Sequence, residues 1–158
     1  MPVKARKITF KSDRAEVLVE LDCAFTKEVR LKISECVSRQ FPGILEQACR
    51  NSHGPKFGDC INTTSLAHIL EHIIIWHLQN MSDLQDGFQN LSDNKLAKRQ
   101  NREAHVDKRG ARVYVGKTVK VAPNLAKIEL KYYDDIHALQ AINCSISALN
   151  TIIETCSD

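Results

Sequence analysis

Residues 64–80 constrain this chain more than any other segment, because they predict a long helix whose two sides differ chemically. At about 100° per residue, one side is hydrophobic, and its members are Leu66, Ile69, Leu70, Ile73 and Ile74. The opposite side gathers polar side chains around Ile75, and these are His68, Glu71, His72 and Gln79. A helix that buries its hydrophobic side has no reason to expose an isoleucine on the other side. We therefore expect a cleft to cover the polar side.

The segments before this helix predict two strands and one shorter helix. Residues 15–21 alternate between hydrophobic and polar side chains, as is typical of a strand, and residues 3–10 predict a neighbouring strand. Thr26 can cap a helix over residues 27–40, and a short helical segment is expected over residues 44–48. The N-terminal part is therefore expected to run strand, strand, helix.

Segments rich in small and polar residues flank the long helix. Residues 49–62 predict a loop, and any of the three hydroxyl residues at 63–65 can cap the helix that follows. After the helix, residues 81–110 are expected to form an exposed polar excursion without a strand. Basic residues gather at 95–112 without interleaved aromatic residues, so a solvated loop is favoured over a nucleic-acid interface.

The C-terminal part predicts a β-hairpin and a closing helix. Residues 112–121 and 125–133 alternate like paired strands, and Asp134 or Asp135 can cap a helix after them. This order of elements favours an α+β fold, with a mostly antiparallel sheet and helices packed on one face.

The composition fits a single domain over residues 1–158, with 43% hydrophobic and 26% charged residues. A net charge of +3 is too small to predict nucleic acid or an anionic membrane as a partner. The N-terminus leads into charge rather than into a signal peptide, so a cytoplasmic protein is expected. The six cysteines include no Cys-x-x-Cys pair, and most are expected to be buried thiols. The oligomeric state is left open, a homo-oligomer included.

The polar side of the long helix carries the pattern His-x-x-Glu-His at residues 68–72. Histidines four residues apart stand one helical turn apart and can bind one divalent ion, and a glutamate beside the second can reach a water molecule there. This is the inverted motif of zinc hydrolases. It predicts His68 and His72 as metal ligands and Glu71 as the general base. The alternative is a solvated helix face, which the central position of Ile75 disfavours.

A catalytic zinc normally takes three protein ligands, so one more must come from elsewhere in the chain. The candidates are Cys49, His53, Cys60, Glu129, Asp134 and Asp135. Cys49 and His53 belong to the loop before the helix, which can fold back over the site. His77 lies near the centre of the hydrophobic side and is expected to be a core histidine with satisfied hydrogen bonds, while Trp76 is expected to pack.

The motif and its flanking segments resemble the N-terminal domain of cyanophycin synthetases. That family carries a closely similar Leu-Ala-His-x-x-Glu-His stretch, which corresponds to residues 66–72. Further similar segments are the strand at 17–22, the Phe-Pro-Gly-Ile-Leu turn at 41–45, Cys49 with the glycines at 54 and 58, the Val-Tyr-Val-Gly-Lys-Thr strand at 113–118 and the junction at 130–139. The resemblance covers roughly residues 15–150, interrupted by the polar excursion.

This resemblance implies a free-standing metallohydrolase-like domain without synthetase activity. The His-x-x-Glu-His motif also occurs in pitrilysin-type peptidases and S-ribosylhomocysteine lyase, which are similar in having a compact α+β fold around the helix. The residues that match the family's site are the metal histidines His68 and His72, the catalytic Glu71 and a third ligand, Cys49. Asp134 and Asp135 match an acidic pair and, with His53, are expected to contact substrate or surround the ligands.

One departure from the family concerns Trp76, which stands where the family usually has a glutamate. If that glutamate binds metal or substrate, the activity or its substrate is altered here.

The first hypothesis is a zinc-dependent hydrolase that holds one divalent ion, with iron less favoured, and cleaves a peptide or isopeptide bond. The second is a catalytically inactive metal-binding or regulatory domain, which Trp76 favours and Glu71 disfavours. The third is a lyase acting on a sulfur-containing small molecule, for which a small closed pocket is expected instead of an open groove.

Overall fold

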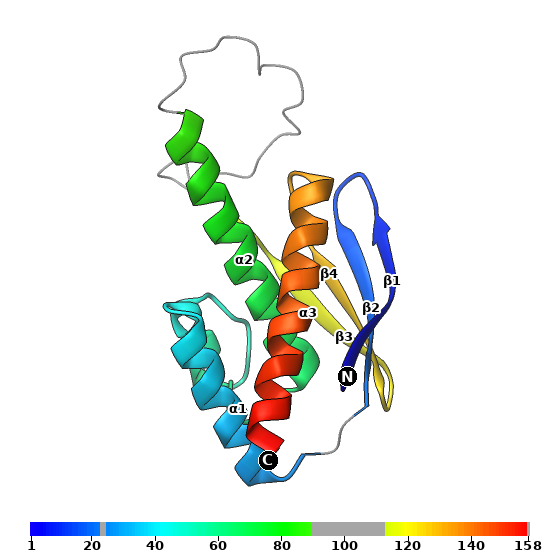
Figure 1. The fold of residues 1–158 in the computed structure, drawn as a ribbon, viewed down its shortest axis with the longest axis vertical. Helices are drawn as coiled ribbons and strands as arrows, with labels where there is room; N and C mark the ends of the chain where they lie inside the picture. Colours follow the sequence, from blue (N-terminus) through cyan, green and yellow to red (C-terminus); the bar gives the residue numbers. More distant parts are fainter. Residues whose placement is uncertain (23–24, 90–112, 158) are drawn as a thin grey trace.

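A four-stranded antiparallel sheet and three helices make up the described part of the chain, residues 1–22, 25–89 and 113–157 of a computed structural model (Figure 1). The strands are β1 (Val3–Phe10), β2 (Ala15–Leu21), β3 (Gly116–Ala122) and β4 (Leu125–Leu130). The helices are α1 (Lys27–Gln40), α2 (Leu66–Gln89) and α3 (Asp135–Ser157). Two short 3-10 turns, η1 (Ile44–Glu46) and η2 (Phe57–Asp59), lie between α1 and α2.

The sheet has the strand order β1-β2-β4-β3, which places β3 at one edge. One face is hydrophobic because alternate residues point the same way, and Val17, Val19 and Ile128 are fully buried there. The other face carries ion pairs, among them Arg6–Glu20, Lys11–Glu16 and Lys127–Glu129. The alternation that predicts strands in the sequence therefore separates a core face from a charged, solvated face.

The helices form a layer on the hydrophobic face of the sheet. Helix α2 contacts β2, β3 and β4, while α3 lies against α2, α1 and β1 (Figure 1). The predicted caps are present, because Thr26 Oγ1 accepts a hydrogen bond from the Val29 amide and Asp134 Oδ1 accepts one from the His137 amide. The predicted α+β class with an antiparallel sheet and helices on one face is confirmed.

Several predicted boundaries differ from the structure, and the strands expected over 112–121 and 125–133 are β3 (Gly116–Ala122) and β4 (Leu125–Leu130). Helix α2 continues to Gln89, so the first part of the expected polar excursion at 81–110 is helical, and residues 90–112 lie outside the described part. A polar composition does not stop a helix that is already nucleated. The expected helical segment over 44–48 is only the 3-10 turn η1, because the backbone of Ala48 instead forms a bridge with Lys56.

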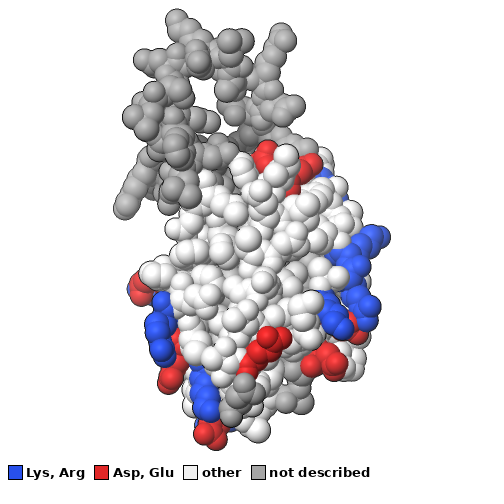
Figure 2. All heavy atoms as spheres, in the orientation of Figure 1, with Lys and Arg blue, Asp and Glu red and all other residues white. Residues whose placement is uncertain are grey.

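Helix α3 is long and hydrophobic enough to cross a membrane by length and composition alone, with a mean hydropathy of 1.2. Its acidic residues are Asp135 and Glu154, it has no lysine or arginine, and Figure 2 shows few charges on the visible surface over it. In this fold it packs against α1, α2 and β1 and buries side chains such as Ile142, Leu149 and Ile153. Its hydrophobic residues therefore supply part of the core of the domain.

Asn150 joins the C-terminal helix to the first strand. Its side chain is 4% exposed, its Oδ1 accepts a hydrogen bond from the Val3 amide at 2.9 Å, and its Nδ2 donates to the Val3 carbonyl at 2.9 Å. Val3 is itself buried, so water cannot replace these two hydrogen bonds without opening the core.

We expect Asn150→Leu to lower the free energy of unfolding by about 2–3 kcal/mol, because both backbone groups of Val3 lose their partner while staying buried. Urea denaturation followed by circular dichroism measures this change. Thr151→Ala is the control, because Thr151 is exposed on the same helix, and it is expected to change stability by less than about 0.5 kcal/mol. Equal effects of the two substitutions would show that the Asn150 contacts do not stabilise the fold.

Candidate metal centre

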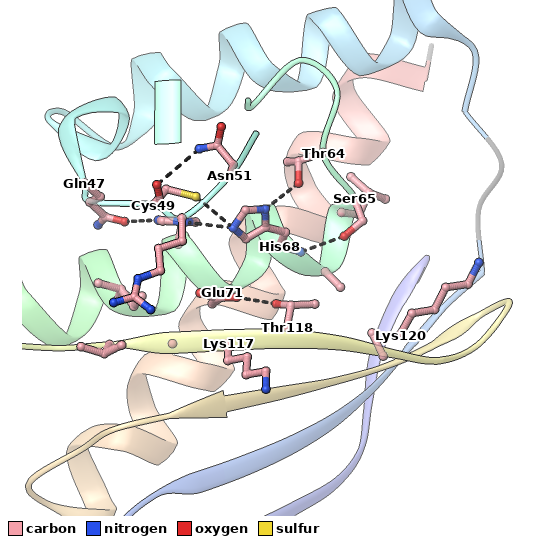
Figure 3. A pocket seen from close by; sticks show the side chains of 18 of the residues that line it. Gln47, Cys49, Asn51, Thr64, Ser65, His68, Glu71, Lys117, Thr118 and Lys120 are labelled. Atoms are coloured by element: carbon pink, nitrogen blue, oxygen red, sulfur yellow. Dashed lines mark hydrogen bonds between the residues drawn. The ribbon is translucent and has the colours of Figure 1, made fainter. Parts of the chain in front are cut away.

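A groove with a volume of about 2050 Å³ runs between the polar face of α2, the segment after α1 and the edge strand β3. The segment before α2 contributes residues at 47–55 and 64–65, the helix contributes residues at 66–79, and the hairpin contributes residues at 113–126. Figure 3 shows these three parts around His68 and Glu71. The cleft that Ile75 predicts is present, since Ile75 is buried and lines this groove.

Three potential ligand atoms meet in this groove. Nε2 of His68 lies 3.2 Å from Nε2 of His72 and 3.4 Å from Sγ of Cys49. All three atoms lie within 4.8 Å of one another, so this group could hold a metal ion. The prediction that His68, His72 and Cys49 come together is confirmed, and the loop before α2 is the part of the chain that folds back over the helix.

Hydrogen bonds on the far side of each imidazole ring orient both Nε2 atoms toward the centre. Nδ1 of His68 lies 2.5 Å from Thr64 Oγ1, and Nδ1 of His72 lies 2.7 Å from Gln47 Oε1. Gln79 orients the Gln47 amide in turn, because Nε2 of Gln47 donates a hydrogen bond to Oε1 of Gln79 at 3.4 Å. His72 therefore donates through Nδ1–H and keeps Nε2 as an acceptor, the form that binds metals.

Backbone hydrogen bonds position Cys49 over the helix. The Cys49 amide donates to the Pro55 carbonyl at 2.9 Å, and the Phe57 amide donates to the Gln47 carbonyl at 2.9 Å. These two hydrogen bonds lie on either side of the Ala48–Lys56 bridge, and together they close the loop between these residues. Because the backbone of Cys49 is fixed and its side chain is only 8% exposed, the thiol is held in place before any metal binds.

Burial keeps both histidines neutral. Phe57 stacks on the ring of His72, with centroids 3.9 Å apart, and His72 is 2% exposed. Burial, with a smaller contribution from the nearby His68, lowers the pKa of His72 to about 3. Burial also lowers the pKa of His68. Neutral imidazoles are the metal-binding form, so at neutral pH no proton has to leave them before a metal binds.

Glu71 lies beside the ligand group and faces β3. It is 5% exposed, and Thr118 Oγ1 donates a hydrogen bond to its Oε2 at 2.5 Å (Figure 3). Burial raises the pKa of Glu71, and the Thr118 hydrogen bond acts in the opposite direction. The strand approaches closely because residue 116 is glycine, since a Cβ there would lie 2.7 Å from Cγ and Oε1 of Glu71.

Cys60 is a second thiol near the centre but not a member of the ligand group. Its Sγ lies 3.9 Å from Sγ of Cys49 and 3.5 Å from the Phe57 carbonyl. The group of atoms that lie within 4.8 Å of one another contains Cys49, His68 and His72 alone among the described residues. Burial raises the pKa of Cys60 to about 12, with a further contribution from Cys49. Cys60 therefore serves as a natural control for Cys49.

Three predicted site residues are not brought to the groove formed by the described residues. Asp134 caps α3, where it lies 3.4 Å from Nδ1 of His137, and Asp135 begins the same helix. His53 is exposed in the loop, and its amide donates to Asn51 Oδ1. These positions do not line the groove. Glu129, another candidate ligand, pairs with Lys127 on the outer face of the sheet.

The prediction for His77 is wrong and that for Trp76 is confirmed. Nε2 of His77 is buried without a hydrogen-bond partner in the part of the chain that the structure describes, although a satisfied histidine is expected there. Its ring instead packs edge-on against Phe41, which offers no acceptor. Trp76 packs on Phe41 and donates from Nε1 to the Pro42 carbonyl at 2.9 Å.

The sequence did not predict the residues that support the candidate ligands, namely Gln47, Phe57, Thr64 and Thr118. Thr64 has a local signal, because it precedes His68 by four residues and so lies on the same helical face. Gln47 and Thr118 come from distant segments, and no local pattern in the sequence points to them.

Comparison with family models and with curated protein sequences gives no match for this chain. The resemblance to cyanophycin synthetases therefore stays a prediction, and the reading of this site rests on its geometry.

We expect Cys49→Ser to weaken zinc binding by at least about tenfold, because the thiolate is a far better zinc ligand than a hydroxyl. Competition with a chromophoric chelator measures the affinity, and elemental mass spectrometry measures the zinc content per chain. Cys60→Ser is the matched control and should leave both values unchanged. Equal losses in the two variants would mean that the thiols support the fold and do not bind metal.

We expect the metal-free protein to become less stable as the pH falls, through His72. The folded pKa of about 3 lies below the ordinary value of 6.5, so the contribution of His72 is complete above pH 6.5 and is lost progressively toward pH 3. The maximal slope for one proton is about 1.4 kcal/mol per pH unit. Urea denaturation with a chelator present, at several pH values, should show a shallower slope in His72→Gln, while the exposed His53→Gln keeps that of the wild type. An unchanged slope in His72→Gln would contradict this assignment.

Proposed function

We propose that this protein is a zinc-dependent hydrolase that cleaves a peptide or isopeptide bond. The observation that carries this proposal is the arrangement of Cys49, His68 and His72 around one point of a large groove, with the buried carboxyl group of Glu71 in the same groove. Three protein ligands that leave one position open are typical of catalytic zinc sites, whereas structural sites use four.

Two of the three separations between the ligand atoms are close to those of a zinc site, and the third, between His72 Nε2 and Cys49 Sγ, lies within 4.8 Å. Ordinary Zn–N and Zn–S bond lengths in a tetrahedral site separate two nitrogens by about 3.3 Å and a nitrogen from a sulfur by about 3.6 Å. The corresponding separations here are 3.2 Å between the two Nε2 atoms and 3.4 Å between His68 Nε2 and Cys49 Sγ. A donor set of imidazole and thiolate favours zinc over the harder cations calcium and magnesium.

Glu71 and Thr118 have different roles in the proposed reaction. Zinc, when bound, polarises a carbonyl group and lowers the pKa of water. Glu71 accepts the proton that water loses as its oxygen bonds to the carbonyl carbon, and returns it to the nitrogen as the carbon–nitrogen bond breaks. Thr118 holds the carboxyl group through its 2.5 Å hydrogen bond, so Glu71 remains in one orientation for both transfers.

The size of the groove supports an extended substrate. Its volume of about 2050 Å³ exceeds the roughly 300–1,000 Å³ that is usual for small-molecule sites. The edge strand β3 lies along it, and an unpaired strand edge can form backbone hydrogen bonds with an extended peptide. These two features favour a peptidase or amidase over a lyase with a small closed pocket.

The tryptophan at position 76 leaves the ligand set intact. Trp76 packs against Phe41 and does not line the groove, so its side chain does not take the place of a ligand or of the base. Cys49, His68, His72 and Glu71 are all present without a carboxylate at position 76. The alternative of an inactive metal-binding domain therefore receives no support from this substitution.

We expect the zinc-loaded protein to hydrolyse a peptide or isopeptide substrate and Glu71→Gln to reduce the rate by about 100-fold or more, the usual effect of removing a general base. Release of free amine measures turnover, and elemental mass spectrometry should find the same zinc content in both proteins. Glu46→Gln is the control, because it removes an exposed carboxylate outside the groove, and it should keep full activity.

The outcomes separate the alternatives. Undiminished turnover in Glu71→Gln would remove Glu71 from the mechanism. Stoichiometric zinc without turnover of peptide or isopeptide libraries would identify a binding domain, and failure to bind zinc would refute the metal centre.

A further inference from the structure

The groove is lined by positive charge. Its basic residues are Arg30, Arg50, Lys117 and Lys120, and Glu71 is the sole acidic residue among the described residues that line it. Because Glu71 is buried and engaged by Thr118, it does little to neutralise the exposed cations at the rim. The whole chain has a net charge of only +3, so this concentration of cations is a property of the groove.

Among the described residues, the four cations of the groove have no acidic partner, unlike Arg6, Lys11 and Lys127 on the outer face of the sheet. The ion pairs between the described residues use the cations Arg6, Lys11, Arg14, Lys56, Lys127 and His137. None of the four basic residues of the groove takes part in an ion pair within the described part of the chain. Arg30 contacts the site by another route, because its Nη1 donates to the Thr64 carbonyl at 3.3 Å. Unpaired cations in a cleft attract an anionic ligand.

The cations stand on both sides of Glu71. Arg50 follows the ligand Cys49 in the loop, whereas Lys120 lies on β3, two residues beyond Thr118 and on the same face of the strand. Two residues of a strand span about 7 Å. In Figure 3, Lys120 and Cys49 lie on opposite sides of Glu71 and Thr118, while Lys117 extends to the other side of β3. Arg50 and Lys120 are therefore placed to contact residues on either side of a scissile bond near Glu71.

We propose that the groove selects acidic peptides, with aspartate or glutamate side chains that pair with Arg50 and Lys120. This inference rests on the proposed hydrolase function, because it names the substrate class of the same site. A peptide fits better than other polyanions because one edge of β3, which no other described strand pairs, can offer backbone hydrogen bonds beside the cations. Residues of an extended peptide are about 3.3 Å apart, as they are in β3, so a peptide paired with that edge keeps its side chains in step with those of the strand.

Binding of labelled peptides to the full-length Glu71→Gln protein tests this proposal without turnover. Three short peptides alternate alanine with glutamate, glutamine or lysine, and fluorescence anisotropy at low ionic strength gives their affinities for the zinc-loaded and metal-free protein. We expect the glutamate peptide to bind at least about tenfold more tightly than the glutamine peptide, and the lysine peptide to bind more weakly than both. Added salt should weaken the glutamate peptide selectively.

Charge reversal at Arg50 and Lys120 tests whether these two residues form part of the peptide-binding surface. Arg50→Glu and Lys120→Glu should each weaken binding of the glutamate peptide by roughly fivefold to tenfold, allowing for solvent screening of exposed pairs. Lys32→Glu on α1 is the matched control, because it makes the same change in net charge at an exposed position outside the groove, and it should have little effect.

Several results would overturn the proposal. Equal losses in all three variants would mean that only the net charge matters, and preference for the glutamine or lysine peptide would exclude acidic selection. Competition by single-stranded DNA as strong as that by unlabelled glutamate peptide would indicate general polyanion binding. Failure of the metal centre is distinguishable, because selective binding by a protein that takes up no zinc would leave the acidic preference standing and refute the hydrolase.

Discussion

Helix α2 is buried on two opposite faces, and the remainder of the structure depends on this constraint. Its hydrophobic face, with Leu70 and Ile73 fully enclosed, packs on α3 and the sheet. Its polar face is covered by the loop before it and by β3, so His72 and Glu71 are buried as well. Buried polar groups require hydrogen-bond partners. The covering segments must therefore present polar atoms at defined places, and these atoms surround the group that could hold a metal ion.

The partners of the polar face also prepare it for chemistry. Thr64 and Gln47 occupy the outer nitrogens of the two imidazole rings, which leaves the inner nitrogens for a cation. Thr118 fixes the carboxyl group of Glu71. Among the described residues, the four cations that line the groove form no ion pairs, whereas Arg6, Lys11 and Lys127 on the outer face of the sheet do. The outer face of the sheet is thus a solvated surface with ion pairs, whereas the groove has an excess of positive charge that attracts an anionic ligand.

Most of the fold could be predicted because its signals are local. Alternation over residues 15–21 and the capping residues Thr26 and Asp134 predict elements that the structure contains at nearly the same bounds. The predictions fail where long-range packing decides. Ala48 leaves the expected helical turn to pair with Lys56. Propensity and periodicity describe neighbours in sequence, and this outcome depends on a neighbour in space.

For the site, the sequence by itself determined that His68, Glu71 and His72 share one helical face, because helical geometry fixes the direction of side chains three and four residues apart. It left the third ligand open among residues far apart in the chain. Only the tertiary structure places Cys49 beside the two histidines and leaves Asp134, Asp135 and His53 outside the groove, because loop closure brings that thiol over the helix. The supporting hydrogen bonds and the cations along the groove likewise depend on contacts between segments that are far apart in the sequence. No local sequence pattern predicts such contacts.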